Sequence, residues 1–323
     1  MTCEVFRSAE SADGRFGPCV LAIGNFDGVH IGHRALIERA VAAADARGAV
    51  PAVLTFHPHP AAVVAPHRRP RLICSLDKRI ELLGAAGIRR VLVLPFTPEV
   101  ARLSPADFIR QIVIEALGTR AIFVGENFHF GHKQAGTPAV LEELGKAWGV
   151  EVTFVAPVTF RGQVVSSTAV RQALEAGRVV RAAHLLGRCY SVEGPVVSGR
   201  GIGSKQTVPT LNLRPDPELL VPMGIYVTET LEPATERRWS SVTSSGYNVT
   251  FGATEHTVET YLLDKLENES PHEIEVRFRH FLRAEEKYPD AQTLKAQILK
   301  DVARAEVYWR RAGRFRLMEP SIY

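Results

Sequence analysis

The residues best placed for chemistry lie in Gly24-Asn25-Phe26-Asp27-Gly28-Val29-His30-Ile31-Gly32-His33. The glycines let the backbone approach a phosphate group, and a helix that starts after this turn offers it free N–H groups. His30 and His33 can both donate to one phosphate, which stabilises charge at a phosphorus centre without a protein nucleophile. A lone histidine here would usually be structural, but two at this spacing favour phosphate chemistry.

A second glycine-rich segment runs from Gly199 to Asn212 and ends in Pro209-Thr210-Leu211-Asn212. Successive backbone N–H groups in such a loop can wrap phosphate oxygens. Thr210 and Asn212 lie on one face of a strand, and their oxygens suit a hard cation. A cross-strand hydrogen-bonded pair explains the same spacing, so the segment alone leaves both interpretations open.

Two further segments carry polar side chains that could take part in phosphate chemistry. At a predicted helix start, Ser167 and Thr168 can cap the helix, and Arg171 one turn later can bind an anion. A plain capped helix with an exposed arginine fits equally well. Glu259 lies in a strand-like segment where Val258 and Leu262 predict apolar surroundings. The alternative is a solvent-facing carboxylate.

The elements that position these residues change in kind along the chain. The first half alternates apolar strand-like runs with helical patterns, which predicts a parallel sheet covered by helices. Ser104 is expected to cap one of the helices. The strands are expected at 19–24, 50–56, 91–96, 121–124 and 152–155, and the helices at 33–47, 75–86, 105–117 and 138–148.

The second half is rich in β-like segments. Two more helices are predicted at 167–176 and 178–186, and strands follow after Gly187. In the last of them Ile274, Val276 and Phe278 alternate with charged residues, as in a strand with one wet face. A helix is expected near 290–310. We therefore expect two domains, 1–187 and 188–323. The strands are expected at 190–197, 224–230, 239–243, 257–263 and 273–282.

Length, charge and cysteine content indicate how many domains the chain has, which partners it lacks and which compartment suits it. A chain of 323 residues suits two domains of ~100–200 residues each. Its 39 basic and 35 acidic residues give a charge of +4, too small a surplus to favour a nucleic-acid partner. The first 17 residues lack the apolar stretch of a signal peptide, and no run approaches membrane-spanning length. Four cysteines without a CxxC pair favour a reducing compartment. We expect a cytoplasmic protein without a membrane partner.

The first motif resembles the FMN adenylyltransferase branch of the HxGH nucleotidyltransferases, which implies a Rossmann-like fold. Thr55–Pro60, Gly125–Gly131 and Ser166–Arg171 resemble further segments of that family. The resemblance implies that the FMN phosphate attacks the α-phosphorus of ATP and releases pyrophosphate, with Mg²⁺ neutralising the triphosphate. It assigns catalytic roles to His30 and His33. The implied nucleotide contacts are Gly24, Asn25, Phe26, Asp27, Gly28, Ser167, Thr168 and Arg171, and the implied flavin contacts are Asn127, Phe128, Phe130 and Gly131.

The second half resembles the riboflavin kinase module, which implies a β-barrel with a terminal helix. Gly199–Asn212, Gly246–Gly252, Val258–Asp264 and Arg283–Tyr288 carry this resemblance. The resemblance implies that Gly201 and Gly203 bind nucleotide, Thr210 and Asn212 hold Mg²⁺, and Glu259 is the general base. The chain departs from the family pattern at Ser204, Gln206, Thr207, Val208, Leu211, Asn248 and Val249.

Together the two resemblances imply a bifunctional enzyme that converts riboflavin to FMN and then FMN to FAD. ATP would be the co-substrate of both steps, with FMN and FAD as substrate and product rather than prosthetic groups. Two alternatives stay open. The first site could act on another phosphorylated acceptor, or the chain could be a flavin- or nucleotide-binding regulator with an inactive kinase module. The sequence does not determine the oligomeric state.

Overall fold

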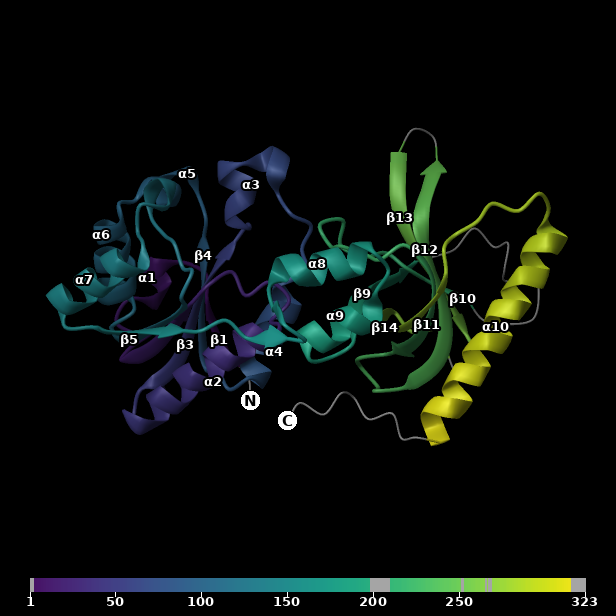
Figure 1. The fold of residues 1–323 in the computed structure, drawn as a ribbon, viewed down its shortest axis with the longest axis horizontal. Helices are drawn as coiled ribbons and strands as arrows, with labels where there is room; N and C mark the ends of the chain where they lie inside the picture. The colour runs from purple at the N-terminus through teal and green to yellow at the C-terminus, as the bar shows by residue number, and fades with distance from the viewer. Residues whose placement is uncertain (1–2, 198–209, 251–252, 265, 267–268, 315–323) are drawn as a thin grey trace. The chain divides into compact units, whose positions relative to one another are not determined.

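The structure, a computed structural model, describes residues 3–197, 210–250, 253–264, 266 and 269–314. The chain folds into two compact units, residues 1–166 and 167–323 (Figure 1). Each unit is described by itself.

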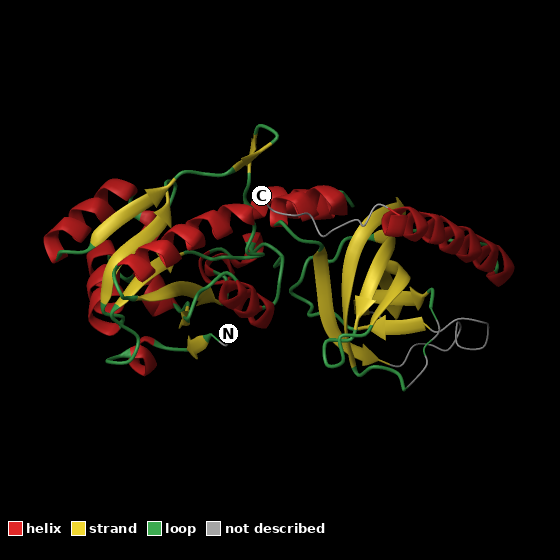
Figure 2. Cartoon of the chain, turned by 90° about the horizontal axis from the view of Figure 1, so that it is seen from below, coloured by secondary structure: helices red, strands yellow, loops and turns green. Residues whose placement is uncertain are grey.

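The first unit is built on a six-stranded, fully parallel sheet with the order β1-β4-β3-β2-β5-β6 (Figure 2). The central strand β2 is buried along its whole length, as expected for a parallel strand covered on both faces. The strands are β1 (Glu4–Phe6), β2 (Cys19–Ile23), β3 (Val50–His57), β4 (Arg90–Pro95), β5 (Thr119–Gly125) and β6 (Glu151–Val155).

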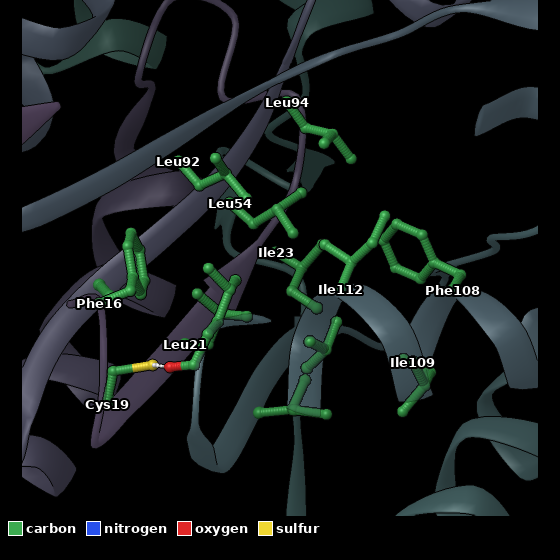
Figure 3. Close-up of a cluster of buried hydrophobic side chains, with 14 of the residues drawn as sticks. Phe16, Cys19, Leu21, Ile23, Leu54, Leu92, Leu94, Phe108, Ile109 and Ile112 are labelled. Atoms are coloured by element: carbon green, nitrogen blue, oxygen red, sulfur yellow. Dashed lines mark hydrogen bonds between the residues drawn. The ribbon is translucent and has the colours of Figure 1, made fainter. Parts of the chain in front are cut away.

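Helices cover both faces of this sheet, which confirms the predicted α/β architecture. One buried cluster joins α2 (Ile31–Ala46) and α4 (Leu76–Ala85) to the sheet. A second joins α1 (Ala9–Ala12), the π-helical η2 (Phe108–Ala116) and α7 (Pro138–Trp148) to its other face. Figure 3 shows part of this second cluster, with Phe108 and Ile112 of η2 among strand residues such as Ile23 and Leu54.

Shorter elements complete the unit. Ser104 caps the α6–η2 helix by accepting the N–H of Asp107, as predicted. The remaining elements are α3 (Pro60–Val64), η1 (Pro66–Arg68), α5 (Pro98–Arg102), α6 (Pro105–Asp107), η3 (His132–Gln134) and the hairpin β7 (Thr159–Phe160) and β8 (Gln163–Val164).

The strand order reverses at the centre of the sheet. From β2 the chain continues to β3 and β4 on one side, whereas β5 pairs with β2 on the other side and continues to β6. In open α/β sheets, ligands bind outside the carboxyl ends of strands at such a reversal. The segments that follow β2 and β5 therefore border the expected ligand crevice, and both are among the segments that the sequence analysis singled out.

The second unit opens with α8 (Ser167–Glu175) and α9 (Val179–Leu186), which pack on each other, and α9 packs on β9 and β14. Six antiparallel strands close a barrel in the order β10-β13-β12-β11-β14-β9, and α10 (Ala291–Arg314) lies against β11 and β12 (Figure 1). This confirms the predicted barrel and terminal helix. The strands are β9 (Tyr190–Val197), β10 (Thr210–Leu213), β11 (Gly224–Leu231), β12 (Arg238–Thr250), β13 (Ala253–Leu262) and β14 (Glu273–Arg283).

The barrel interior has an apolar and a polar part. Ile274, Val276 and Phe278 are fully buried, as their alternation predicts. On the neighbouring strands the buried residues are hydroxyl-bearing and bond to one another: Thr228 to Ser241 at 2.8 Å and to Thr243 at 2.7 Å, and Thr243 to Thr260 at 3.0 Å. Because each hydroxyl finds a partner, this buried polar row avoids the cost of unsatisfied groups.

Candidate nucleotide and flavin sites

The turn after β2 has an unusual backbone. Phe26, Gly28 and Val29 have φ values of 48°, 80° and 38°. Left-handed backbone is rare for a β-branched residue such as Val29, and strain of this kind gathers at functional sites. At Gly28 a Cβ atom would also lie 2.7 Å from Cγ2 of Ile73, so glycine is needed there for both conformation and space.

Asp27 holds this turn in place. Its carboxylate is buried and accepts hydrogen bonds from the backbone N–H of Ile73, at 3.0 and 3.1 Å, and of Cys74, at 3.4 Å. The N–H of Gly28 in turn lies 3.3 Å from Sγ of Cys74. These contacts position the turn against residues 73–74. The expected contact of Asp27 with ATP stays a prediction.

His30 and His33 lie together at the start of α2. His30 is the N-cap, and its Nδ1 accepts the backbone N–H of His33 at 3.2 Å. The two imidazole rings stack with their centroids 3.6 Å apart and their planes 15° apart. Because Nδ1 of His30 acts as an acceptor, the ring proton is on Nε2, which is therefore the donor that His30 offers to a ligand. The pairing of the two histidines beside a helix N-terminus is as predicted.

The loop after β5 carries the proposed flavin residues. Phe130 is buried against Phe108, and Phe128 stacks on it with ring centroids 5.5 Å apart. Phe130 therefore supports Phe128, which is half-buried, while Asn127 is exposed. Gly131 has φ +70°, and a Cβ there would lie 2.9 Å from Pro105. This glycine is required by the packing of the loop.

The helix α8 begins at Ser167, as predicted, and belongs to the second unit. Its buried face carries Ala169, Val170, Ala173 and Leu174. Thr168 is exposed, and Ser167 and Arg171 are half-buried. That Arg171 and the two histidines serve one triphosphate stays a prediction.

In the barrel, strand register brings the proposed kinase residues together. Asn212 lies directly opposite Glu259 across the β10–β13 pair, and Thr210 lies opposite Tyr261. Residues directly opposite in register share a face, so Thr210, Asn212 and Glu259 lie on one face of the barrel wall. Leu211 and Leu213 between them are buried. The common face is thus the outer one.

The expectation that Glu259 lies among apolar side chains is wrong. Val258 and Leu262 are fully buried on the inner face of the wall, whereas Glu259 is exposed. The reason is the period of two along a strand, which sends the side chains at 258 and 259 to opposite faces. The sequence also predicts that Glu259 does not lie on the outer face of the barrel, and this prediction is wrong, although Glu259 shares that face with both proposed metal ligands.

Several positions named in the sequence analysis lie outside the described residues. They are Gly201, Gly203, Gly252 and the positions 204 and 206–208, where the chain departs from the riboflavin kinase pattern. Among the residues that the structure describes, no three His, Cys, Asp or Glu side chains cluster to hold a metal ion. The oxygen donors of Thr210 and Asn212 nevertheless suit Mg²⁺, which commonly keeps several waters and uses substrate phosphates as ligands.

Two buried residues near the first motif were missed from the sequence. Cys74 contacts the turn at Gly28, and Arg79 of α4 donates to Thr55, whose hydroxyl in turn donates to the carbonyl of Asn25 at 3.0 Å. Arg79 lies within a helical pattern, where an arginine would be expected to face solvent. No local sequence signal marks it as buried.

Comparison with known proteins places both units in families. The FAD synthetase family model matches residues 14–169, and the riboflavin kinase model matches residues 186–309. The bifunctional riboflavin kinase/FMN adenylyltransferase of Escherichia coli (strain K12) is 31% identical over 90% of this chain and 93% of its own length. This chain belongs to that bifunctional family.

One further relative carries the same name, and one solved structure shares the fold over nearly the whole chain. The bifunctional riboflavin kinase/FMN adenylyltransferase of Pseudomonas fluorescens is 32% identical over 89% of this chain and 92% of its own length. A crystal structure described as a macrolide-efflux protein from Streptococcus pneumoniae has a TM-score of 0.82, at 26% identity, over 95% of this chain and 99% of that one. In the part of this chain that the structure describes, no helix is long and apolar enough to cross a membrane.

Proposed function

We propose that this member of the bifunctional family phosphorylates riboflavin to FMN and then adenylylates FMN to FAD, with ATP as co-substrate of both reactions. The observation that carries this proposal is the presence of two separate sets of phosphate-chemistry residues, which, except for Arg171, lie within the ranges of two different family models. We place both reactions in the cytoplasm, where the four free thiols of the chain would stay reduced.

In the adenylyl transfer, an oxygen of the FMN phosphate forms a bond to the α-phosphorus of ATP, and the bond to pyrophosphate breaks. Nε2 of His30 and the imidazole of His33 donate to phosphate oxygens as charge develops there. The N-terminus of α2 adds backbone N–H groups beside them. We retain Ser167, Thr168 and Arg171 as proposed triphosphate contacts, because Ser167 and Thr168 fall within the range of the FAD synthetase model.

On the flavin side, Phe128 offers an aromatic face to the ring system of FMN. Phe130 supports it from the core at a centroid distance of 5.5 Å. Asn127, exposed on the same loop, supplies polar contacts to the flavin edge. Because this loop follows β5 and the histidine turn follows β2, the two lie at the ends of neighbouring strands.

In the kinase reaction, the 5′-hydroxyl oxygen of the ribityl chain forms a bond to the γ-phosphorus of ATP, and the bond from that phosphorus to the bridging oxygen breaks, which releases ADP. Glu259 takes the hydroxyl proton as general base. Thr210 and Asn212 would hold Mg²⁺, which supplies positive charge to the transferring phosphoryl group when bound. The face shared by these three side chains supports the assignment.

Two substitutions test whether the sites are separate. His33→Ala should lower adenylyl transfer by ~10²–10³, so riboflavin is converted to FMN, which accumulates. Glu259→Gln should lower riboflavin phosphorylation by ~10²–10⁴ while FAD still forms from supplied FMN. Glu273→Gln, at an exposed carboxylate of β14 in the same barrel, is the matched control.

Chromatography of the flavin products gives the answer. A folded His33→Ala protein that loses both reactions equally would contradict two independent sites. Wild-type protein that binds flavin but forms neither FMN nor FAD would instead support the regulator. Activity only towards another phosphorylated acceptor would support the second enzymatic alternative.

A further inference from the structure

The most unusual buried charge in the first unit is Arg79 of α4. Its side chain is only 2% exposed. Nη1 donates to Oγ1 of Thr55 at 3.4 Å and to the carbonyl oxygen of Phe56 at 3.3 Å, both longer than the usual ~2.9–3.0 Å. Nε is buried without a hydrogen-bond partner.

Arg79 also lacks a counter-charge. Across the described ranges of the chain, no carboxylate oxygen lies within ion-pair distance of its guanidinium. Buried charges are normally paired, because removal of an ion from water is costly. A permanently charged side chain held by two neutral oxygens leaves a positive potential in the protein that an anion can neutralise.

The position of this charge indicates which anion. Thr55 and Phe56 are near the carboxyl end of β3, beside β2. The hydroxyl of Thr55, which accepts from Arg79, donates to the carbonyl of Asn25 at 3.0 Å. Arg79 is thus one side chain away from the turn that carries the histidines, at the edge of the sheet where ligands bind.

We propose that Arg79 is a positioning residue for adenylyl transfer, and this inference rests on the proposed function of the first unit. Its charge, located behind the turn, favours binding of the phosphate groups of ATP and FMN. Its hydrogen bonds, through Thr55, fix the backbone of Asn25. The residue is too buried to be a principal ligand contact. It therefore acts by holding the turn in place and by the positive electrostatic potential of its guanidinium group.

The test compares three variants in the FMN-to-FAD reaction. Arg79→Met removes the charge at similar volume, and Arg79→Lys retains it. Lys78→Met is the matched control, because it removes a charge from the neighbouring residue that is paired with Glu81 at 2.9 Å. Riboflavin phosphorylation by the same proteins reports on general damage.

We expect Arg79→Met to raise KM for ATP by about ten- to one-hundredfold, the effect of one unit charge across roughly 6–12 Å at an effective dielectric near 20. Its KM should depend less on ionic strength than that of the wild type, and Arg79→Lys should recover most of the loss. Lys78→Met should change KM by less than about twofold, because its charge is already compensated by Glu81.

The proposal is overturned if Arg79→Met alters KM no more than Lys78→Met, or if Arg79→Lys is as impaired as Arg79→Met. Should Arg79→Met fail to fold, Arg79→Gln, which can still donate to Thr55, takes its place under the same criteria. A wild-type protein that makes no FAD refutes the proposed function itself, whereas normal FAD synthesis with unaffected Arg79 variants refutes only this inference.

Discussion

Replacement of His30 can separate its two proposed roles, because Nδ1 caps the helix and Nε2 is the nitrogen that we assign to phosphate chemistry. Nδ1 accepts the backbone N–H of His33 at 3.2 Å. The N–H group at Nε2 is the one that we propose donates a hydrogen bond to a phosphate oxygen. His30→Asn places an amide oxygen near the position of Nδ1 and has nothing at the position of Nε2. His30→Ala removes both groups.

The magnitudes follow from these contacts. Loss of an N-cap costs about 1 kcal/mol of stability, and loss of the stacking on His33, at 3.6 Å, costs about 0.5–1.5 kcal/mol more. His30→Ala should therefore be less stable than the wild type by roughly 2 kcal/mol. His30→Asn should recover the capping part. Both should lose ~10²–10³ in the rate of adenylyl transfer.

The assay combines urea unfolding with the rate of FAD formation from FMN and ATP, and with the rate of riboflavin phosphorylation. We expect His30→Asn to be more stable than His30→Ala by about 1 kcal/mol, equally poor in FAD formation, and normal as a kinase. If His30→Asn keeps FAD formation within threefold of the wild type, Nε2 is not the catalytic donor and the assignment is refuted.

Three further outcomes are expected. Burial raises the pKa of the Cys19 thiol to about 11, so above pH ~8.5 the unfolded chain loses this proton first and stability falls, by up to about 3 kcal/mol at pH 11. Burial raises the pKa of the Cys3 thiol to about 11 as well, so Cys19→Ala should show a smaller decline in stability than the wild type rather than none. Gly28→Ala forces Cβ to 2.7 Å from Ile73 and should reduce both the unfolding temperature of the first unit and FAD formation, with riboflavin phosphorylation intact. Asp301→Asn breaks the buried, bidentate pair with Arg283, in which Nη2 donates to Oδ2 at 2.7 Å and Nε to Oδ1 at 3.2 Å, and should destabilise the barrel unit by about 3 kcal/mol in thermal unfolding. A loss below about 0.5 kcal/mol would show that the pair contributes little.

Local patterns were sufficient for most of the elements. The helix predicted at 138–148 and the strand predicted at 190–197 have those bounds in the structure. Both have periodic apolar residues and clear ends, Thr137 as N-cap of the first and Gly149 as its left-handed C-cap. The histidine turn was equally evident, because its glycines and histidines are close together in the sequence. Short elements such as β1 and α1 were missed, since three or four residues carry too little periodicity.

What the sequence determined by itself is the type of each element and the chemistry of contiguous motifs, because both depend on residues close in the chain. What only the tertiary structure decided is which side of an element becomes buried and which distant residues meet. Glu259 was expected among apolar neighbours, but barrel closure sent Val258 and Leu262 inward and left the carboxylate outside, opposite Asn212. The sequence of the helix gives no sign that Arg79 is buried. Its charge lies next to Thr55 because α4 packs on the sheet. Burial and long-range pairing are properties of the packed chain, and no local pattern encodes them.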